Sequence, residues 1–309
     1  MSAPVDTPSQ PHVAILTVTT NAAGHLGAYF DALDRVTYRN RSLWIVDNAS
    51  ADGSANLVAQ RQPAASIFVN DSNLGFTGAC NRGLEAILAD GRADYVLFLN
   101  DDTEVRPGFL EPLAALAGPK TMVAPATLLS GSPGMLDDSA GDFDWWRGTW
   151  KTKTLGLPAA VAGSYPHAVE VANLSCLLVP IAAVRDVGLL DDQFFVYYDD
   201  TDFCRRARNR GYRIILEPAS QVDHLKGATL GGQLSPFGCY YLTRNRPYLI
   251  WKHGGRIRFA VFSVYFLGTR VARMALWARS GRRDLVRATL AGLRDFGLRR
   301  MGPGRPPGR

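Results

Sequence analysis

Short apolar runs alternate with amphipathic stretches through the first 120 residues of this chain. Residues 13–20, 42–46, 66–69 and 95–99 are mainly β-branched, aliphatic or aromatic, which predicts four strands. The predicted helices after these strands lie at residues 26–33, up to 61, 79–89 and 107–117. Strands that alternate with helices predict an α/β fold, with a Rossmann-like, mostly parallel, doubly wound sheet and helices on both faces.

The second half of the chain is less regular. A Gly/Ser-rich loop follows residues 121–125, and an aromatic segment occupies residues 142–150 (DFDWWRGTW). Acidic residues at 199–202 favour a helix start because carboxylates stabilise the positive end of a helix dipole, and Gly211 favours its end. The remaining predicted elements are a strand at 171–179, a helix ending at 187, a helix from 199 to 210, and strands at 213–216 and 222–224.

These elements predict one large domain between two short ends. The expected divisions are a disordered lead-in at 1–12, a domain at 13–253 with halves 13–118 and 119–253, a basic amphipathic helical tail at 254–300, and a flexible end at 301–309. The lead-in lacks the basic and apolar regions of a signal peptide. Four scattered cysteines have no metal-ligand spacing and suggest no disulfide framework, which favours a reducing cytoplasmic location.

Positive charge is concentrated near the end of the chain. The net charge is +6, but residues 254–309 contain 13 arginines and two aspartates and carry +11, so the preceding part carries −5. The stretch 259–268 (FAVFSVYFLG) is too apolar for a nucleic-acid-binding arm, so no nucleic-acid partner is expected. A span needs about 20 apolar residues, whereas Arg258 and Arg270 bracket this stretch, so we expect the tail to lie on an anionic membrane surface, at the cytoplasmic face. The alternative is a helical pair packed on the domain.

Two adjacent carboxylates follow the most apolar of the predicted strands. Asp101 and Asp102 come directly after residues 95–100 (YVLFLN). Ligands of open α/β sheets bind beyond the carboxyl ends of such strands. Neighbouring like charges repel unless a cation compensates them, and Mg²⁺ or Mn²⁺ bound to a diphosphate would do so. The alternative role of this pair is a turn or a helix cap.

Five polar segments follow predicted strands or begin predicted helices. They are 17–21 (TVTTN), 46–53 (VDNASADG), 73–83 (NLGFTGACNRG), 99–103 (LNDDT) and 197–205 (YYDDTDFCR). In this order they resemble the family 2 glycosyltransferases of GT-A fold, particularly bacterial rhamnosyltransferase-like and galactofuranosyltransferase-like enzymes, over residues 13–252. The chain departs from the family pattern at Thr20, where relatives commonly have Tyr, and at Cys80 and Arg82.

The resemblance implies a metal-dependent inverting glycosyltransferase. Residues 13–118 would bind a UDP-linked or dTDP-linked sugar such as dTDP-rhamnose, and residues 119–253 would bind the acceptor and catalyse transfer. The acceptor would be a glycan or a polyprenyl-linked molecule of cell-envelope polysaccharide synthesis. One alternative is a nucleotidyltransferase, although residues 17–24 contain no basic residue to bind a triphosphate. The other is a non-catalytic nucleotide-sugar-binding protein.

The resemblance also implies the reactive residues. Asp102 corresponds to the last aspartate of the DXD-like metal motif, and His224 to a third ligand of the divalent cation. Asp200 corresponds to the general base, with Asp199 as the second choice. The alternative roles are structural, because an acidic first turn stabilises a helix and a single histidine is often a packed residue.

The binding residues are implied in the same way. The donor-binding set is Thr19, Asn21, Asp47, Asn73, Gly75, Phe76, Asn81 and Asp101. In this set Asp47 would accept the imide N–H of uracil or thymine, unless it only caps the next helix. The glycines of 73–78 permit close backbone approach, which also suits a tight turn. The acceptor-binding set is Trp145, Trp146 and Tyr198, for which packing is the alternative.

Overall fold

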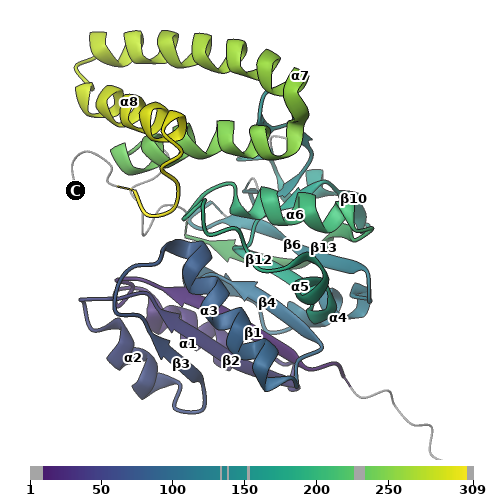
Figure 1. Cartoon of the computed structure of the whole chain (residues 1–309). Helices are drawn as coiled ribbons and strands as arrows, with labels where there is room; N and C mark the ends of the chain where they lie inside the picture. The colour runs from purple at the N-terminus through teal and green to yellow at the C-terminus, as the bar shows by residue number, and fades with distance from the viewer. Residues whose placement is uncertain (1–9, 133, 138, 152–153, 226–233, 305–309) are drawn as a thin grey trace, which may run out of the picture.

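The computed structural model describes residues 10–132, 134–137, 139–151, 154–225 and 234–304. Its centre is a mixed sheet with the order β10-β13-β6-β12-β4-β1-β2-β3, and β5 pairs with β13 (Figure 1). The strands of this sheet are β1 (Val13–Thr19), β2 (Arg41–Asp47), β3 (Ser66–Val69), β4 (Tyr95–Leu99), β5 (Thr103–Val105), β6 (Thr121–Leu129), β10 (His167–Val169), β12 (Cys176–Pro180) and β13 (Arg213–His224). Short strands outside it are β7 (Ala140–Gly141), β8 (Phe143–Asp144), β9 (Thr149–Trp150) and β11 (Val171–Ala172).

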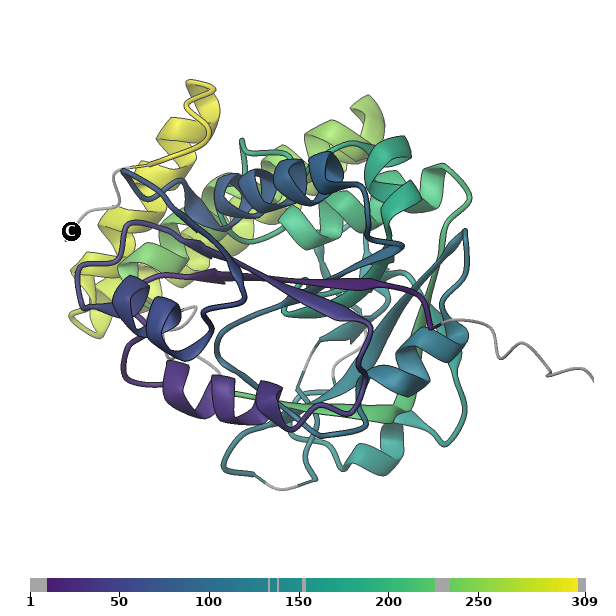
Figure 2. The ribbon, with the colours of Figure 1, turned by 90° about the horizontal axis from the view of Figure 1, so that it is seen from below.

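Helices cover both faces of the sheet, as the alternating pattern predicts (Figure 2). One apolar core lies under α3, α5 and α6, and a second lies under α1, α2 and α4. The helices are α1 (Leu26–Asp34), α2 (Ser54–Arg61), α3 (Gly75–Asp90), α4 (Leu110–Leu116), α5 (Ile181–Val187), α6 (Asp199–Asn209), α7 (Pro236–Arg279) and α8 (Arg283–Gly297), with a 3₁₀ turn η1 (Ala159–Ala162). The strands between the two cores are apolar on both sides because both faces are covered.

The sheet is parallel-rich rather than parallel throughout. Strands β4, β1, β2 and β3 form one parallel group, and β6 and β13 form another. Between these groups β12 runs antiparallel to both β4 and β6. A short apolar run predicts a buried strand but does not encode the direction of that strand, so this reversal could not be predicted from the sequence.

The predicted elements differ from the observed ones at three places. Helix α3 begins at Gly75, four residues before its predicted start. The predicted strand 171–179 is two strands, β11 and β12, which pair with different partners. The two predicted strands at 213–216 and 222–224 are one strand, β13, with a register shift between Glu217 and Gln221. A bulge of this kind interrupts the apolar alternation, so one strand has the sequence pattern of two.

The C-terminal helices begin earlier than predicted. Helix α7 starts at Pro236 and breaks at Gly255, where φ is 71° and ψ is 170°. A positive φ favours glycine, and the chain folds back at this point (Figure 1). We call residues 236–254 the first segment of α7 and residues 256–279 the second segment. The first segment is largely buried against the domain, whereas only Phe262 and Phe266 are buried in the second.

Helix α8 packs on α7, so the tail is partly integrated into the domain. A Cβ added at Gly292 would lie 2.6 Å from the Tyr240 carbonyl oxygen, which shows how closely the two helices approach. Two described residues of the predicted lead-in and flexible end form hydrogen bonds with the domain. The His12 amide donates to Asp94 at 2.7 Å, and the Gly302 amide donates to the carbonyl of Gln193 at 2.8 Å. Residues 1–9 and 305–309 lie outside the described residues.

Candidate active site at the carboxyl edge of the sheet

Four polar side chains at the carboxyl ends of β1, β2 and β4 have buried atoms that lack hydrogen-bond partners. These atoms are Thr19 Oγ1, Asp47 Oδ2, Asp101 Oδ2 and Asp102 Oδ1, which have no hydrogen bond of good geometry among the described residues. Asp102 Oδ1 does face His224 Nε2 at 3.3 Å, and Thr19 lies close enough to Asp101 to lower its pKa. Thr19 and Asp47 are opposite each other in the β1–β2 register, and β4 is the other neighbour of β1. A buried polar atom without a partner costs about 1–3 kcal/mol. Four of them at one sheet edge indicate that a polar ligand belongs there.

The loops after β1 and β2 are fixed to each other beside these atoms. Asn21 has a positive φ of 51°, its amide donates to Ser50 Oγ at 2.9 Å, and its side-chain oxygen accepts the Ala51 amide at 2.8 Å. Asp47 Oδ1 accepts the Ser50 amide at 2.9 Å, which leaves its second oxygen for a ligand. The loops therefore form a rigid support for a base or ribose.

Asn48 joins this support to the loop before α3, and its role was not predicted. Its side-chain amide donates to Asn73 Oδ1 at 3.0 Å, and its side-chain oxygen accepts the Leu74 amide at 2.9 Å. Asn73 Oδ1 in turn accepts the Gly75 amide at 2.8 Å. Asn48 lies beside Asp47 in a segment that the family resemblance includes, so its position in that segment was the available signal.

Gly75 brings the donor-side loop against the loop that precedes α6. A Cβ at Gly75 would lie 2.4 Å from Phe195 Cδ2 and 2.5 Å from the Phe195 carbonyl oxygen. The same carbonyl accepts the Thr77 amide at 3.3 Å. Only glycine can occupy this position, because the approach is close and φ is 74°.

Two of the predicted donor-binding residues, Asn81 and Phe76, have structural partners in the protein. The Asn81 side chain forms two hydrogen bonds with the backbone of Leu190. Nδ2 donates to the Leu190 carbonyl at 2.9 Å, and Oδ1 accepts a hydrogen bond from the Leu190 N–H at 2.9 Å. Phe76 is partly buried and packs against the core under α3. Asn81 therefore fixes α3 to the loop after α5, and its hydrogen-bonding capacity is used there.

Asp102 and His224 come together although they are far apart in the sequence. His224 is opposite Thr103 in the pairing of β13 with β5, and its Nε2 lies 3.3 Å from Asp102 Oδ1. Its Nδ1 lies 3.0 Å from Asp137 Oδ2. Burial alone would lower the pKa of His224, but hydrogen bonds to the two carboxylates raise it to about 9. A carboxylate on Nδ1 orients the ring so that Nε2 faces Asp102.

Asp101 has a different environment from Asp102. It is buried, and its Oδ1 lies 3.6 Å from His25 Nε2. Burial raises the pKa of Asp101, against the stabilising contact with His25. Within the described residues no group of three or more His, Cys, Asp or Glu side chains is arranged to hold a metal ion. Asp102 and His224 can supply two ligands of the kinds that Mn²⁺ accepts, and a bound diphosphate would have to supply others.

Asp199 and Asp200 begin α6, where the preceding Tyr198 has a φ of 69°. Burial and the neighbouring Asp200 charge raise the pKa of Asp199 well above its usual value. Burial raises the pKa of Asp200 to about 6, against hydrogen bonds donated by Thr201. Asp199 is 4% exposed, whereas Asp200 is more accessible. Asp200 is therefore the better candidate for a base, because it is ionised at neutral pH and can be reached.

The third aspartate of this helix is already paired. Asp202 is buried and contacts Arg206 at 2.8 Å, and Lys252 and His253 at 2.7 Å each. Burial opposes ionisation of Asp202, but these partners lower its pKa to about 2. Asp202 therefore joins α6 to the first segment of α7.

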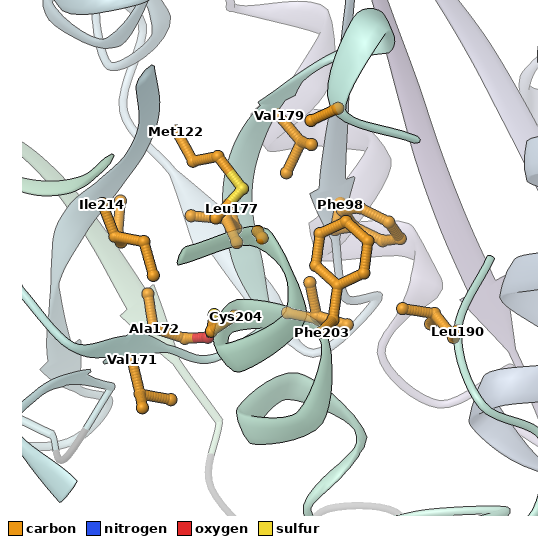
Figure 3. Close-up of a cluster of buried hydrophobic side chains, with 14 of the residues drawn as sticks. Phe98, Met122, Val171, Ala172, Leu177, Val179, Leu190, Phe203, Cys204 and Ile214 are labelled. Atoms are coloured by element: carbon orange, nitrogen blue, oxygen red, sulfur yellow. The ribbon is translucent and has the colours of Figure 1, made fainter. Parts of the chain in front are cut away.

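The apolar side of α6 fixes the position of the aspartates. Phe203 and Cys204 point from α6 into the core, toward residues of β4, β6, β12 and β13 (Figure 3). The Phe203 ring meets the Phe98 ring edge-on, with centroids 6.5 Å apart. Phe98 lies on β4, the strand that leads to Asp101 and Asp102. The candidate base and the candidate metal ligand are thus placed by one packed core.

The loop that ends at Tyr198 is held by two residues that the sequence analysis missed. Phe195, Tyr197 and Tyr198 all have positive φ, a conformation that costs about 1 kcal/mol or more for each. The Asn245 amide donates to the carbonyls of Phe194 and Val196 at 2.8 and 2.7 Å, and Arg244 donates to Phe194 at 3.1 Å. Both residues are fully buried in α7. Adjacent polar residues in a helix usually face solvent, so this role could not be predicted from the sequence.

The three predicted acceptor-binding residues, Trp145, Trp146 and Tyr198, have different environments. Trp145 is buried, packs against Phe143 and His253, and has the Arg205 guanidinium 4.8 Å from its ring. Trp146 is 51% exposed and has Arg258 at 5.2 Å. Both tryptophans line an open pocket of about 440 Å³ that also includes Arg258. Tyr198 directly precedes Asp199 and Asp200 at the start of α6, and its hydroxyl donates to the Gly148 carbonyl at 3.4 Å.

Comparison with curated proteins gives relatives with related activities. The N-acetylglucosaminyl-diphospho-decaprenol L-rhamnosyltransferase of Mycobacterium tuberculosis is 25% identical over 244 residues, which is 70% of this chain and 77% of that protein. The low-salt glycan biosynthesis hexosyltransferase Agl10 of Haloferax volcanii is 24% identical over 210 residues, 65% of this chain and 66% of that protein. The conserved stretch thus extends over most of this chain.

Solved structures show the same fold at low sequence identity. S. aureus TarS 1–349 is 13% identical with a TM-score of 0.55, and the match covers 94% of this chain and 82% of that one. GalNAc-T7, solved with UDP, GalNAc and Mn²⁺, is 14% identical with a TM-score of 0.57. That match covers 77% of this chain and 48% of GalNAc-T7, so this chain spans about half of its length. Both neighbours are GT-A glycosyltransferases.

The comparisons agree with the resemblance that the motifs carry. Residues 14–158 match the family model described as glycosyl transferase family 2. This segment contains the strand ends with the unpartnered Thr19, Asp47, Asp101 and Asp102 atoms. Residues 14–158 therefore correspond to a glycosyl transferase family 2 domain, and the chain has the GT-A fold.

Proposed function

We propose that this protein is an inverting glycosyltransferase that uses a UDP-linked or dTDP-linked sugar and a glycan or lipid-linked acceptor. The observation that carries the proposal is the row of buried, unpartnered atoms at the ends of β1, β2 and β4. Asp47 Oδ2 is available to accept the imide N–H of uracil or thymine. Asp102 Oδ1, which faces His224 Nε2 at 3.3 Å, lies on the same edge and would meet the cation of a nucleoside diphosphate complex.

Asp102 and His224 are the residues that would hold a divalent cation. Their donor set, one carboxylate and one imidazole, suits Mn²⁺ or Mg²⁺ completed by diphosphate oxygens. The cation would compensate the charge that develops on the departing diphosphate. This assignment draws support from GalNAc-T7, whose structure contains Mn²⁺.

Asp200 is the group that would remove the proton from the acceptor hydroxyl. The hydroxyl oxygen then attacks the anomeric carbon as the bond from that carbon to the diphosphate breaks, and a single displacement inverts the configuration. Asp199, which burial favours in its protonated form, can donate a hydrogen bond but cannot accept the proton at neutral pH. A non-catalytic binding protein would not need an accessible carboxylate at this place.

Nucleoside diphosphates should stabilise the protein against heat. With Mn²⁺, UDP or dTDP at 100 times its Kd is expected to add about 2.7 kcal/mol to the free energy of unfolding, which raises Tm by several degrees. Thermal unfolding with UDP, dTDP, GDP and ADP measures this effect. GDP and ADP are the controls, because guanine and adenine lack the pyrimidine imide that Asp47 would bind. If none of the four raises Tm in the presence of Mn²⁺, the proposed function is wrong.

The second segment of α7 has the character of a membrane-docking surface, as the tail was predicted to have. Its outward face is apolar and exposed, with Ile257 80%, Val264 77% and Val271 62% exposed. The segment is long and apolar enough to cross a membrane by composition, and 11% of its most apolar window is buried. Arg258 and Arg270 interrupt a span but suit a helix that lies in an anionic interface. We propose that this face binds the cytoplasmic leaflet close to a lipid-linked acceptor.

Vesicle flotation tests the docking surface. The wild-type protein is expected to float with phosphatidylglycerol-containing vesicles and less with pure phosphatidylcholine. Val264→Glu should reduce flotation at least several-fold, because it places a charge on the apolar face. Val69→Glu, on an exposed valine at the end of β3, is the matched control and should float like the wild type. Equal flotation of both variants, or no flotation of the wild type at low salt, contradicts the docking surface.

A further inference from the structure

Two arginines near the catalytic pair carry charges that no carboxylate compensates among the described residues. Arg246 lies in the first segment of α7 and is 8% exposed. Arg270 lies in the second segment, and its Nε is buried without a hydrogen-bond partner. Both guanidinium groups pack on the Phe266 ring, whose centroid lies 5.4 Å from each guanidinium carbon. The chain reverses direction at Gly255, and this reversal brings the two segments of α7 together with their arginines.

Backbone contacts place Arg246 near the hydroxyl of Tyr198. Arg246 Nε donates to the Arg147 carbonyl at 2.9 Å, and the next carbonyl, that of Gly148, accepts the Tyr198 hydroxyl at 3.4 Å. Arg246 and Tyr198 therefore bind neighbouring carbonyls of one turn. Tyr198 directly precedes Asp199 and Asp200. The charges of Arg246, Arg270 and Asp200 all act on the Tyr198 phenol, whose pKa burial raises.

Holding these arginines together is unfavourable without an anion. Burial, and then the charges of Arg246 and Arg273, lower the pKa of Arg270. Arg273 is exposed one turn further along the same helix and extends the positive region to the surface. Guanidinium groups bind phosphate oxygens with two parallel hydrogen bonds, so a phosphate would satisfy both the charge and the unused N–H groups.

We propose that Arg246 and Arg270 bind a phosphate group of the acceptor, with Arg273 at the edge of this subsite. The inference rests on the proposed function and identifies the acceptor as a lipid-linked phosphate or diphosphate. The donor diphosphate is assigned to the carboxyl edge of the sheet, where Asp102 and His224 lie 3.3 Å apart. The apolar outward face of the second segment, on the same helix as Arg270, would accept the lipid chain.

Binding of two diphosphates by the full-length protein tests the subsite. The probes are farnesyl diphosphate for the acceptor side and UDP with Mn²⁺ for the donor side, each measured by isothermal titration calorimetry, with farnesol as the uncharged control. Arg270→Gln is expected to weaken farnesyl diphosphate binding roughly tenfold or more, as loss of a charge-assisted hydrogen bond would, and to leave UDP binding within twofold. Arg270→Lys, which keeps the charge, should lie between Arg270→Gln and the wild type.

The control variants separate this subsite from the donor site and from folding. Arg287→Gln changes an exposed arginine on α8 and should alter neither affinity, and the Tm of each variant shows whether it is folded. Loss of UDP binding in Arg270→Gln with unchanged farnesyl diphosphate binding would overturn the proposal and assign the arginines to the donor. Equal binding of farnesol and farnesyl diphosphate would also overturn it. A third outcome separates the two proposals. If the wild type binds farnesyl diphosphate but neither UDP nor dTDP, and Arg270→Gln binds farnesyl diphosphate weakly, the subsite is supported and the proposed function is rejected.

Discussion

Asp200→Asn is expected to bind donor and cation as the wild type does and to transfer sugar at least about 100-fold more slowly. The amide has nearly the size and polarity of the carboxylate but cannot accept the acceptor proton, and general base catalysis contributes about 10²–10⁴-fold. Transfer measured with saturating donor, together with donor affinity by calorimetry, separates the two effects. Asp199→Asn is the matched control and should be milder, because burial already favours the protonated form of Asp199.

The same assignment predicts how activity depends on pH. Burial raises the pKa of Asp200 to about 6. Only the ionised carboxylate can take a proton, so kcat/KM should rise as pH increases through about 6 and level off above 7. A well-folded Asp200→Asn protein with near-native turnover would move the assignment to Asp199, and a wild-type profile that is flat between pH 5 and 8 would contradict it as well.

Asp102→Ala should lose both cation-dependent donor binding and transfer. The substitution removes the carboxylate oxygen that is buried and unpartnered at the end of β4, so the diphosphate charge is poorly compensated. We expect transfer to fall by about 10²-fold or more, and excess EDTA to reduce the wild type to a similar level. Calorimetry with UDP in the presence and absence of Mn²⁺ measures the binding part. Full wild-type activity in EDTA would exclude a cation-dependent mechanism.

His224→Ala provides the contrast to Asp102→Ala. If His224 is a ligand, its loss should weaken the Mn²⁺ dependence of UDP binding, and a high Mn²⁺ concentration should restore part of the activity. If it only stabilises the end of β13 through Asp102 and Asp137, Tm should fall while the Mn²⁺ dependence stays the same. The two roles therefore differ in a measurement that does not depend on transfer.

The sequence predicted the elements of the first half well because each strand and helix there has its own local pattern. The apolar runs that became β1 to β4 and the helical spacing of α1 needed no information from distant residues. The pairing of β12 with β4 and β6 was different, because strand direction depends on how the intervening chain returns to the sheet. The bulge in β13 likewise depends on its partner β6 rather than on its own residues.

The candidate site was predicted mainly through the order of family motifs. Asp47, Asp102 and Asp200 lie at strand or helix ends, where local patterns already favour a polar residue. The contact of His224 with Asp102 depends on the pairing of β13 with β5, and β5 itself was not predicted. Arg244 and Asn245 were missed for a related reason, since their partners are backbone carbonyls of a distant loop. Every residue has a backbone carbonyl, so a hydrogen bond to a carbonyl does not require any particular residue type at that position.

The contact between Gly75 and Phe195 limits how this enzyme could be recombined with its relatives. Gly75 belongs to the first half of the domain, residues 13–118, and Phe195 to the second half, residues 119–253, and no side chain fits between them. The β4–β12 pairing crosses the same boundary over five residue pairs. Chimaeras that exchange the first half to change donor preference would therefore need matched surfaces at both places. Donor preference in this fold would be easier to alter by point substitutions around Asp47 than by exchanging modules.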